Sequence, residues 1–335
     1  MLRSVGRSLA SREVWVGIAI VFLLLLPVLA VWHDQHYLVT QFRKYLIFAI
    51  AAVSLNLILG YGGMVSFGQA AFVGVGAYTV GMLNAFGLGA ELSYALTNPI
   101  ASWALAAFAG AIFAMVIGAV SLRTSGVYFI MITLAFAQLL YFIVIGLKDL
   151  GGEEGLRFRP ERDVFGLFSL NNGIVFYYTV LGVLALVLCF SAAIVKSRFG
   201  YVLQGSRDNE RRMRSLGFDV FYYKLVAFVI SGAVAGLAGG MLATHEAFVS
   251  PAIMHWGRSG DLIIMVILGG IGTLFGPVVG AVLFLFLEGF LPDYSTHWML
   301  PFGILLILIV YFARQGLYGL LRPLPSKMTI GAEHA

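Results

Sequence analysis

Long apolar stretches dominate this chain and leave little room for a water-soluble domain. Hydrophobic residues make up 60% of its 335 residues and charged residues only 11%, unlike a soluble globular protein. A helix needs about 20 mainly apolar residues to cross the roughly 30 Å hydrocarbon core of a bilayer. The sequence therefore predicts an all-α polytopic membrane protein, with one transmembrane domain over residues 1–335.

Charged, glycine-rich or proline-bearing joints separate the apolar segments. Three arginines precede the first segment, as in a signal peptide, but its length and the missing cleavage site favour a retained helix that kinks at Pro27. Pro99 and Pro277 fit the first turn of a helix. About ten transmembrane or half-membrane helices are expected, at residues 14–32, 45–60, 64–86, 99–121, 127–147, 173–195, 222–243, 261–272, 277–291 and 298–313.

The distribution of basic residues predicts the orientation of these segments. Fourteen of the 21 Lys and Arg residues fall on the side of the N-terminus, and seven fall on the other side. The positive-inside rule then places both termini and the loop 196–221 in the cytoplasm, and the loop 151–172 outside. The excess of Lys and Arg is explained by this orientation, and no stretch alternates basic with aromatic residues. No nucleic acid is therefore expected as a partner.

Two apolar segments are interrupted by glycines in the same way. "ILGYGGMVSFG" (58–68) and "ILGGIGTLFG" (267–276) both place a glycine-rich joint and one hydroxyl residue between Ile-Leu-Gly and Phe-Gly. Unwound backbone is tolerated in a membrane where it lines a cavity or is buried in protein. We therefore expect a translocation path near the midplane between the joints, formed by Asn56, Gly62, Gly63, Ser66, Gln69, Gly269, Gly270, Gly272 and Thr273.

The alternative is that these glycines have only a structural role and allow helices to pack closely. The triplets Gly232/Gly236/Gly240 and Gly272/Gly276/Gly280 have the spacing of a packing motif, and packing is the favoured interpretation for the first triplet. Ser66 and Gln69 are expected to share one face at the start of a helix.

Several kinds of chemistry are missing from the sequence. No Asp, Glu, Lys or Arg is expected at mid-membrane depth, where ion-coupled carriers keep a coupling group; Glu288 should extend to the outer interface. The histidines fall at outer helix ends or in the tail, although a metal site joining His245 and His255 stays open. Cys189 has no partner, no nucleotide-binding or catalytic motif is present, and no cofactor is expected in this chain.

A short charged stretch, "GSRDNERRMRSLGFD" (205–219), stands out from the apolar background. We predict a two-turn helix over 209–216 with Asp208 as N-cap and Gly217 after its C-terminus. Asn209, Met213 and Leu216 would share one partly apolar face, and Glu210 would pair with Arg214. Such an element suits the groove of a soluble partner, whereas the alternative is a solvated loop whose arginines touch lipid headgroups.

Three separated stretches resemble one family. Residues 56–83, 205–240 and 266–281 are similar to the LivM-type permease subunit of branched-chain amino-acid ABC importers, and urea-importer permeases are close relatives. The resemblance implies that Arg207, Asp208, Asn209, Glu210, Met213, Leu216 and Gly217 couple this chain to ATP-hydrolysing subunits.

The same resemblance implies the partners and the location. They are a LivH-like second permease, two cytoplasmic ATPase subunits that bind the ATP and Mg, a periplasmic solute-binding protein and lipid, in a bacterial inner membrane. The sequence departs from the family pattern at Arg211 and Arg212, where alanines are usual, and at Gln69, where histidine is common. Ile271 replaces a basic residue of the urea permeases, which favours an amino acid or a similar small solute.

Two other functions remain open at this point. A stand-alone secondary carrier or channel would use the same broken helices. A scaffold that recruits a cytoplasmic partner would need the charged segment without any path.

Overall fold

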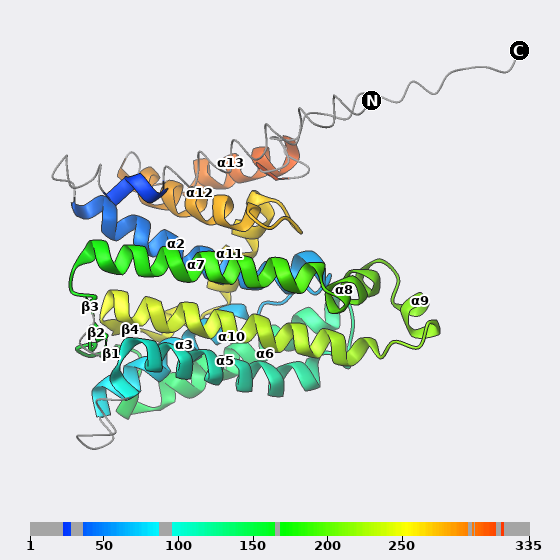
Figure 1. Ribbon diagram of the computed structural model, residues 1–335, viewed down its shortest axis with the longest axis horizontal. Coiled ribbons are helices and arrows are strands. Elements are labelled where there is room, and N and C mark those ends of the chain that lie inside the picture. The colour runs from blue at the N-terminus through cyan, green and yellow to red at the C-terminus, as the bar shows by residue number, and fades with distance from the viewer. Residues whose placement is uncertain are drawn as a thin grey trace, which may run out of the picture.

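The computed structural model describes residues 23–27, 36–86, 96–164, 168–293, 297, 299–312 and 316–317. Its long helices run side by side along one axis (Figure 1), which confirms the all-α polytopic architecture. The helices are α2 (His36–Asn56), α3 (Gln69–Phe86), α5 (Pro99–Ser121), α6 (Val127–Gly146), α7 (Gly173–Lys196), α8 (Arg198–Asp208), α9 (Glu210–Ser215), α10 (Val220–Glu246), α11 (Trp256–Gly269), α12 (Gly276–Phe290) and α13 (Met299–Phe312). Short single turns are η2 (Lys148–Leu150), η3 (Pro251–Met254) and η4 (Leu291–Asp293).

Within the described part of the chain, five helices are long and apolar enough to cross a membrane. One of them is α2 together with the π-helix η1 (Leu57–Tyr61), and the others are α5, α6, α7 and α10. The most apolar window of α2 is 83% buried, against 17% for α6 and 22% for α7. Helix α2 is therefore the centre of the bundle, while α6 and α7 turn apolar faces outward.

Glycines hold α3, α5 and α10 in close contact. A Cβ added to Gly239 would lie 1.8 Å from the carbonyl oxygen of Val73 in α3, and one on Gly232 would lie 2.3 Å from Cβ of Ala114 in α5. Small residues allow membrane helices to approach until their backbones touch. The packing interpretation of the triplet Gly232/Gly236/Gly240 is confirmed.

Some predicted boundaries were wrong. Helix α2 begins at His36 instead of residue 45, because Arg43 and Lys44 lie inside the helix and find partners on α10. Helix α3 begins at Gln69 instead of residue 64. The first expected helix, 14–32, lies mostly outside the described residues; within it, residues 23–27 are helical.

Two short strand pairs close one end of the bundle, and the sequence analysis did not foresee them. Strand β1 (Leu156–Arg157) pairs with β4 (Phe248–Val249), and β2 (Asp163–Val164) pairs with β3 (Phe168–Ser169), both antiparallel. Figure 1 shows these strands at the end opposite α8 and α9.

Candidate functional site

The first broken joint occupies residues 62–68, between η1 and α3. The helix of α2 widens into the π-helical turn η1 before it stops, and the backbone N–H of Met64 still donates to the carbonyl oxygen of Ile58, 2.9 Å away. A π-helical turn inside a helix frequently marks a functional position. The chain then runs without helical structure to Gln69.

The second joint follows α11 and is tied together by one hydroxyl group. Thr273 Oγ1 donates to the carbonyl oxygen of Gly270 at 2.8 Å and accepts from the backbone N–H of Gly276 at 3.1 Å. Helix α11 has 14 residues, about 21 Å at 1.5 Å per residue. This is too short to cross the membrane, as the sequence predicted.

Asn56, the last residue of α2, connects the two joints directly. Its Nδ2 donates to the carbonyl oxygen of Thr273 at 2.8 Å, and its Oδ1 accepts from the N–H of Gly272 at 2.9 Å. One buried amide thus satisfies a donor and an acceptor of unwound backbone, which would otherwise be costly in a membrane interior. The two glycine-rich stretches, about 210 residues apart in sequence, form one site in space.

Arg207, at the C-terminal end of α8, reaches this site. Its Nη1 donates to the carbonyl oxygen of Gly60. Its side chain fills the space beside two glycines with positive φ: a Cβ on Gly63 (φ +67°) would lie 2.8 Å from Cγ of Arg207, and one on Gly272 (φ +73°) would lie 3.6 Å from Nη1. The predicted coupling segment therefore touches both joints, a contact that sequence spacing did not reveal.

The joints lie toward the end of the bundle that carries α8 and α9, and their position near the midplane of a membrane stays a prediction. Asn56 is the twentieth of the 25 residues in the span Tyr37–Tyr61. The contact with Arg207 places the first joint at the end that carries α8 and α9. The non-helical stretch 62–68 then leads back into the bundle, to Gln69.

Gln69 belongs to a buried polar cluster in which sequence reasoning missed two members. Its Nε2 donates to Ser54 Oγ at 2.7 Å and to Ser231 Oγ at 3.0 Å, and these serines come from α2 and α10. Its Oε1 has no hydrogen-bond partner among the described residues. A buried acceptor without a partner is available to water or to a passing solute.

Ser66 does not share a helical face with Gln69, so that prediction was wrong. It precedes α3, and its Oγ accepts from the N–H of Gly68 at 3.1 Å. The hydroxyl group stabilises the turn into the helix instead.

Helices α8 and α9 meet at a single residue, Asn209. Its N–H closes α8 by donating to the carbonyl oxygen of Gly205 at 2.9 Å, and its Oδ1 caps α9 by accepting from the N–H of Arg212 at 3.0 Å. Asp208 instead ends α8, so the predicted N-cap is off by one residue. At the other end, Phe218 and Gly217 donate to the carbonyls of Met213 and Arg214, the bond pattern of a glycine-terminated helix.

Glu210 pairs with two cations. It accepts from Arg214 at 2.5 Å, as the i,i+4 spacing predicted, and from Lys224 of α10 at 2.6 Å. Partial burial alone would raise the pKa of the Glu210 carboxyl, but Lys224 and Arg214 outweigh it and hold the pKa below its ordinary value. The second pair attaches α9 to the membrane-embedded body.

The predicted apolar face of α9 is only partly available to a partner. Met213 is half-buried, and a Cβ on Gly205 would lie 2.8 Å from its Sδ, so Met213 packs against α8. Leu216 is 66% exposed, and Phe218 and Tyr222 extend the exposed apolar surface beside it. The surface that α9 offers is therefore centred on Leu216 and not on Met213.

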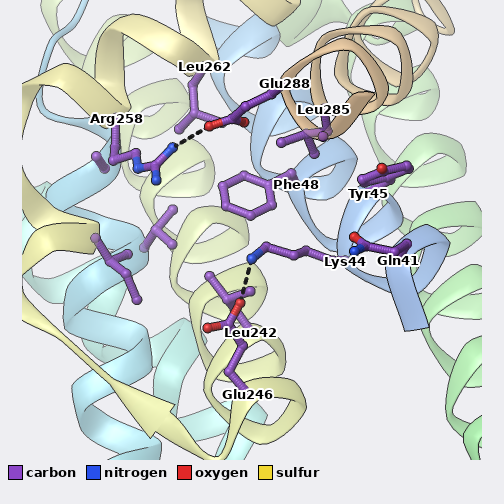
Figure 2. A pocket seen from close by; sticks show the side chains of 14 residues that line it. Gln41, Lys44, Tyr45, Phe48, Leu242, Glu246, Arg258, Leu262, Leu285 and Glu288 are labelled. Atoms are coloured by element: carbon purple, nitrogen blue, oxygen red, sulfur yellow. Dashed lines mark hydrogen bonds and ion pairs between the residues drawn. The ribbon is translucent and has the colours of Figure 1, made fainter. Parts of the chain in front are cut away.

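A cavity of about 260 Å³ lies on the other side of the joints, among α2, α3, α10, α11 and α12. Figure 2 shows two ion pairs there, Lys44 with Glu246 at 2.8 Å and Arg258 with Glu288 at 3.4 Å. The sequence analysis expected Glu288 to extend to the outer interface and gave it no partner; the structure pairs it with Arg258. The lining is completed by Gln41, Tyr45, Phe48, Ala70, Val73, Leu242, Ile253, Leu262, Leu285 and Gly289.

His245 and His255, the two histidines considered for a metal site, have separate partners. His245 Nδ1 accepts from Arg43 Nε at 3.0 Å, whereas His255 Nδ1 accepts from the N–H of Gly257 at 3.2 Å and so caps α11. Over the described ranges, no group of three or more His, Cys, Asp or Glu side chains is placed to hold a metal ion.

Comparison with known proteins identifies the kind of molecule that carries this site. The family model described as "Branched-chain amino acid transport system / permease component" matches residues 37–310. The chain belongs to this permease family. It is a multi-pass membrane permease subunit of an importer, as the resemblance of its three motifs implied.

Individual relatives are also permease proteins of branched-chain amino acid transport systems. The high-affinity branched-chain amino acid transport system permease protein LivM of Escherichia coli (strain K12) is 29% identical over 302 residues, which cover 83% of this chain and 69% of that protein. The probable LivM of Methanocaldococcus jannaschii is 26% identical over 313 residues, 81% and 90% of the two chains. The probable LivH permease of the same organism is 28% identical over 244 residues, 69% and 73% of the two chains. No solved structure matches.

Proposed function

We propose that this permease subunit works in an ATP-driven importer that moves branched-chain amino acids, or a similar small organic solute, across a bacterial inner membrane. Its partners would be a LivH-like second permease, two cytoplasmic ATPase subunits that hydrolyse ATP with Mg, and a periplasmic solute-binding protein. The names of the curated relatives support the solute class. Both termini would face the cytoplasm.

The contact between Arg207 and Gly60 is the observation that carries the coupling part of this proposal. An ATPase that binds the exposed end of α9 around Leu216 would push on α8 through Asn209. Arg207 ends α8 and is hydrogen-bonded to the backbone of the first joint. Asn56 carries the same displacement to the second joint.

The arrangement also supports a path between the joints. Arg207 contacts the unwound backbone at Gly63 and at Gly272. The first unwound stretch also holds Gly62 and the second holds Gly270 and Thr273, while Gly269 is the last residue of α11. Backbone groups freed from helices can contact a solute briefly without binding it tightly. Transient contact of this kind suits a permease that receives its cargo from a separate binding protein.

The proposal is tested by purifying the chain from its native membrane, identifying the proteins that come with it by mass spectrometry, and reconstituting the complex in proteoliposomes. We expect ATPase subunits and a second permease to be recovered, and uptake of labelled leucine only when ATP and binding protein are present. Leucine flux through the chain alone, without any ATPase, would contradict the proposal and identify a secondary carrier or channel.

A further inference from the structure

The cavity shown in Figure 2 is bounded by the helices that flank both broken joints. Helix α2 precedes the first joint and α3 follows it, while α11 precedes the second joint and α12 follows it. Helix α10 and Ile253 of the turn η3 complete the wall. The two joints therefore connect four of the five helices that line the cavity. A molecule held in this cavity would be coupled to the joints without touching them.

The charges of the side chains that line the cavity balance to zero, and Asp261, outside the lining, also pairs with Arg258. Lys44 and Arg258 supply two positive charges, and Glu246 and Glu288 supply two negative charges. In Figure 2 the ring of Phe48 lies between the two ion pairs. A solute with a single charge would leave one of these groups in excess, whereas a solute with one positive and one negative charge leaves the balance intact.

The ion pairs are weakly held and can exchange partners. Their side chains remain 30–48% exposed, and ion pairs with this much solvent contact contribute little to stability. Arg258 is also shared with Asp261 at 3.1 Å. A carboxylate could replace a glutamate beside Lys44 or Arg258, and an ammonium group could replace a cation beside Glu246 or Glu288, with the charge-assisted hydrogen bonds preserved.

Apart from Gln41 and Gly289, the rest of the lining is aliphatic and aromatic. Phe48 from α2, Leu242 from α10, Leu262 from α11 and Leu285 from α12 all contribute. The volume of about 260 Å³ lies below the range of about 300–1,000 Å³ that is usual for drug-sized ligands. The cavity thus has space for a small apolar group, and it has an ion pair at each of two places, Lys44 with Glu246 and Arg258 with Glu288.

We propose that this cavity is a solute-binding site of the permease for a zwitterionic α-amino acid with a short aliphatic side chain, whose carboxylate and ammonium groups exchange with the two ion pairs. The class of solute rests on the proposed function, but the location of the site does not. The site would receive the solute before it reaches the joints, since the cavity lies on the far side of them from α8.

The single native cysteine makes the test simple. In a Cys189→Ser chain within the complete importer, Leu285→Cys places a thiol in the cavity, and Lys148→Cys places a control thiol in an exposed turn near the same end. Membranes are treated with a methanethiosulfonate reagent in the presence of L-leucine, leucinamide, which lacks the carboxylate, or 4-methylpentanoate, which lacks the ammonium group. Saturating leucine should slow labelling of the Leu285→Cys thiol at least tenfold, while the two analogues at the same concentration change it less than twofold and Lys148→Cys is unaffected.

Neutral double variants test the charges themselves. Lys44→Met with Glu246→Met, and Arg258→Met with Glu288→Met, keep the net charge and should raise the leucine concentration needed for half-protection about tenfold or more. Equal protection by all three compounds, or none by leucine in membranes that import leucine with ATP, would overturn the site but leave the proposed function standing. Protection without ATP-dependent uptake would support the site and count against the proposed function.

Discussion

Arg207 donates a hydrogen bond to the carbonyl oxygen of Gly60, which joins the exposed α8–α9 segment to the end of the central helix α2. Arg207→Met keeps most of the stem that packs against Gly63 but removes the donor. A hydrogen bond from a charged group contributes about 1.5–3 kcal/mol. We expect ATP-dependent uptake to fall roughly tenfold or more while ATP hydrolysis continues.

The ratio of solute imported to ATP hydrolysed in proteoliposomes measures this effect. Arg198→Met, at the exposed start of the same helix, is the matched control and should leave the ratio unchanged. An unchanged ratio in Arg207→Met would show that this hydrogen bond has no role in coupling.

Glu210→Lys tests the attachment of α9 to the body. In the wild-type chain Arg214 and Lys224 share the Glu210 carboxylate. The change replaces that carboxylate with a third cation. We expect uptake to be lost while the chain inserts into the membrane in normal amount. Adding Lys224→Glu restores one ion pair and should recover part of the uptake; Glu153→Lys, in an exposed turn at the opposite end, is the control. Wild-type uptake in Glu210→Lys would count against the coupling role.

Protonation of Glu210 should loosen α9 at low pH. Because the folded-state pKa of this carboxyl lies below its ordinary value of 4.5, its stabilising contribution is complete above about pH 4.5 and is lost as the pH falls through the lower folded-state value. A spin label on Ser215→Cys, in a Cys189→Ser chain, should gain mobility only below pH 4.5. In Glu210→Gln the label should be mobile at every pH; a wild-type transition above pH 6 would implicate another group.

Asn56→Ala should destabilise the chain and impair uptake together. It leaves the N–H of Gly272 and the carbonyl of Thr273 without their present partner, and each unsatisfied buried group costs about 1–3 kcal/mol. Asn56→Asp keeps the acceptor for Gly272 and should lie between alanine and wild type. Thermal unfolding in detergent measures the first effect, with Asn171→Ala, at an exposed position, as control.

Gly239→Ala should be destabilising by steric conflict. The added methyl group would lie 1.8 Å from the carbonyl oxygen of Val73, and overpacking of this kind costs about 1–3 kcal/mol. Gly182→Ala, in the middle of α7, meets nothing within 4 Å and should be neutral or stabilising by about 0.5–1 kcal/mol. If both variants melt at the same temperature, the close contact of α3 and α10 does not limit stability.

Local patterns in the sequence predicted the elements that depend on local physics. Composition indicated the membrane fold, and helix bounds such as Pro99–Ser121 followed from proline and apolar length. The glycine-rich pattern that occurs twice in the sequence located both joints. The Glu210–Arg214 pair followed from helical spacing. The assignment of Gly217 as the residue after α9 likewise needed no tertiary information.

The failures arose where a distant segment decides the outcome. Arg43 and Lys44 looked like a loop because their partners, His245 and Glu246, lie about 200 residues away. The contact between Arg207 and both joints depends on the position of α8, which no periodicity reveals. Met213 turns inward because Gly205 leaves space for it on the neighbouring helix. The ion pairs of the cavity were not predicted, because they exist only once α2 meets α10 and α11 meets α12.

Asn209 alone, in an extended conformation with φ −157° and ψ 95°, separates the rod of α8 from that of α9. A change in the two backbone torsions of this one residue changes the angle between the two helices. Such a change leaves the hydrogen bonds within α8 and α9 intact, so the contact of Met213 with Gly205 and the ion pair of Glu210 with Lys224 are what limit how far α9 can swing.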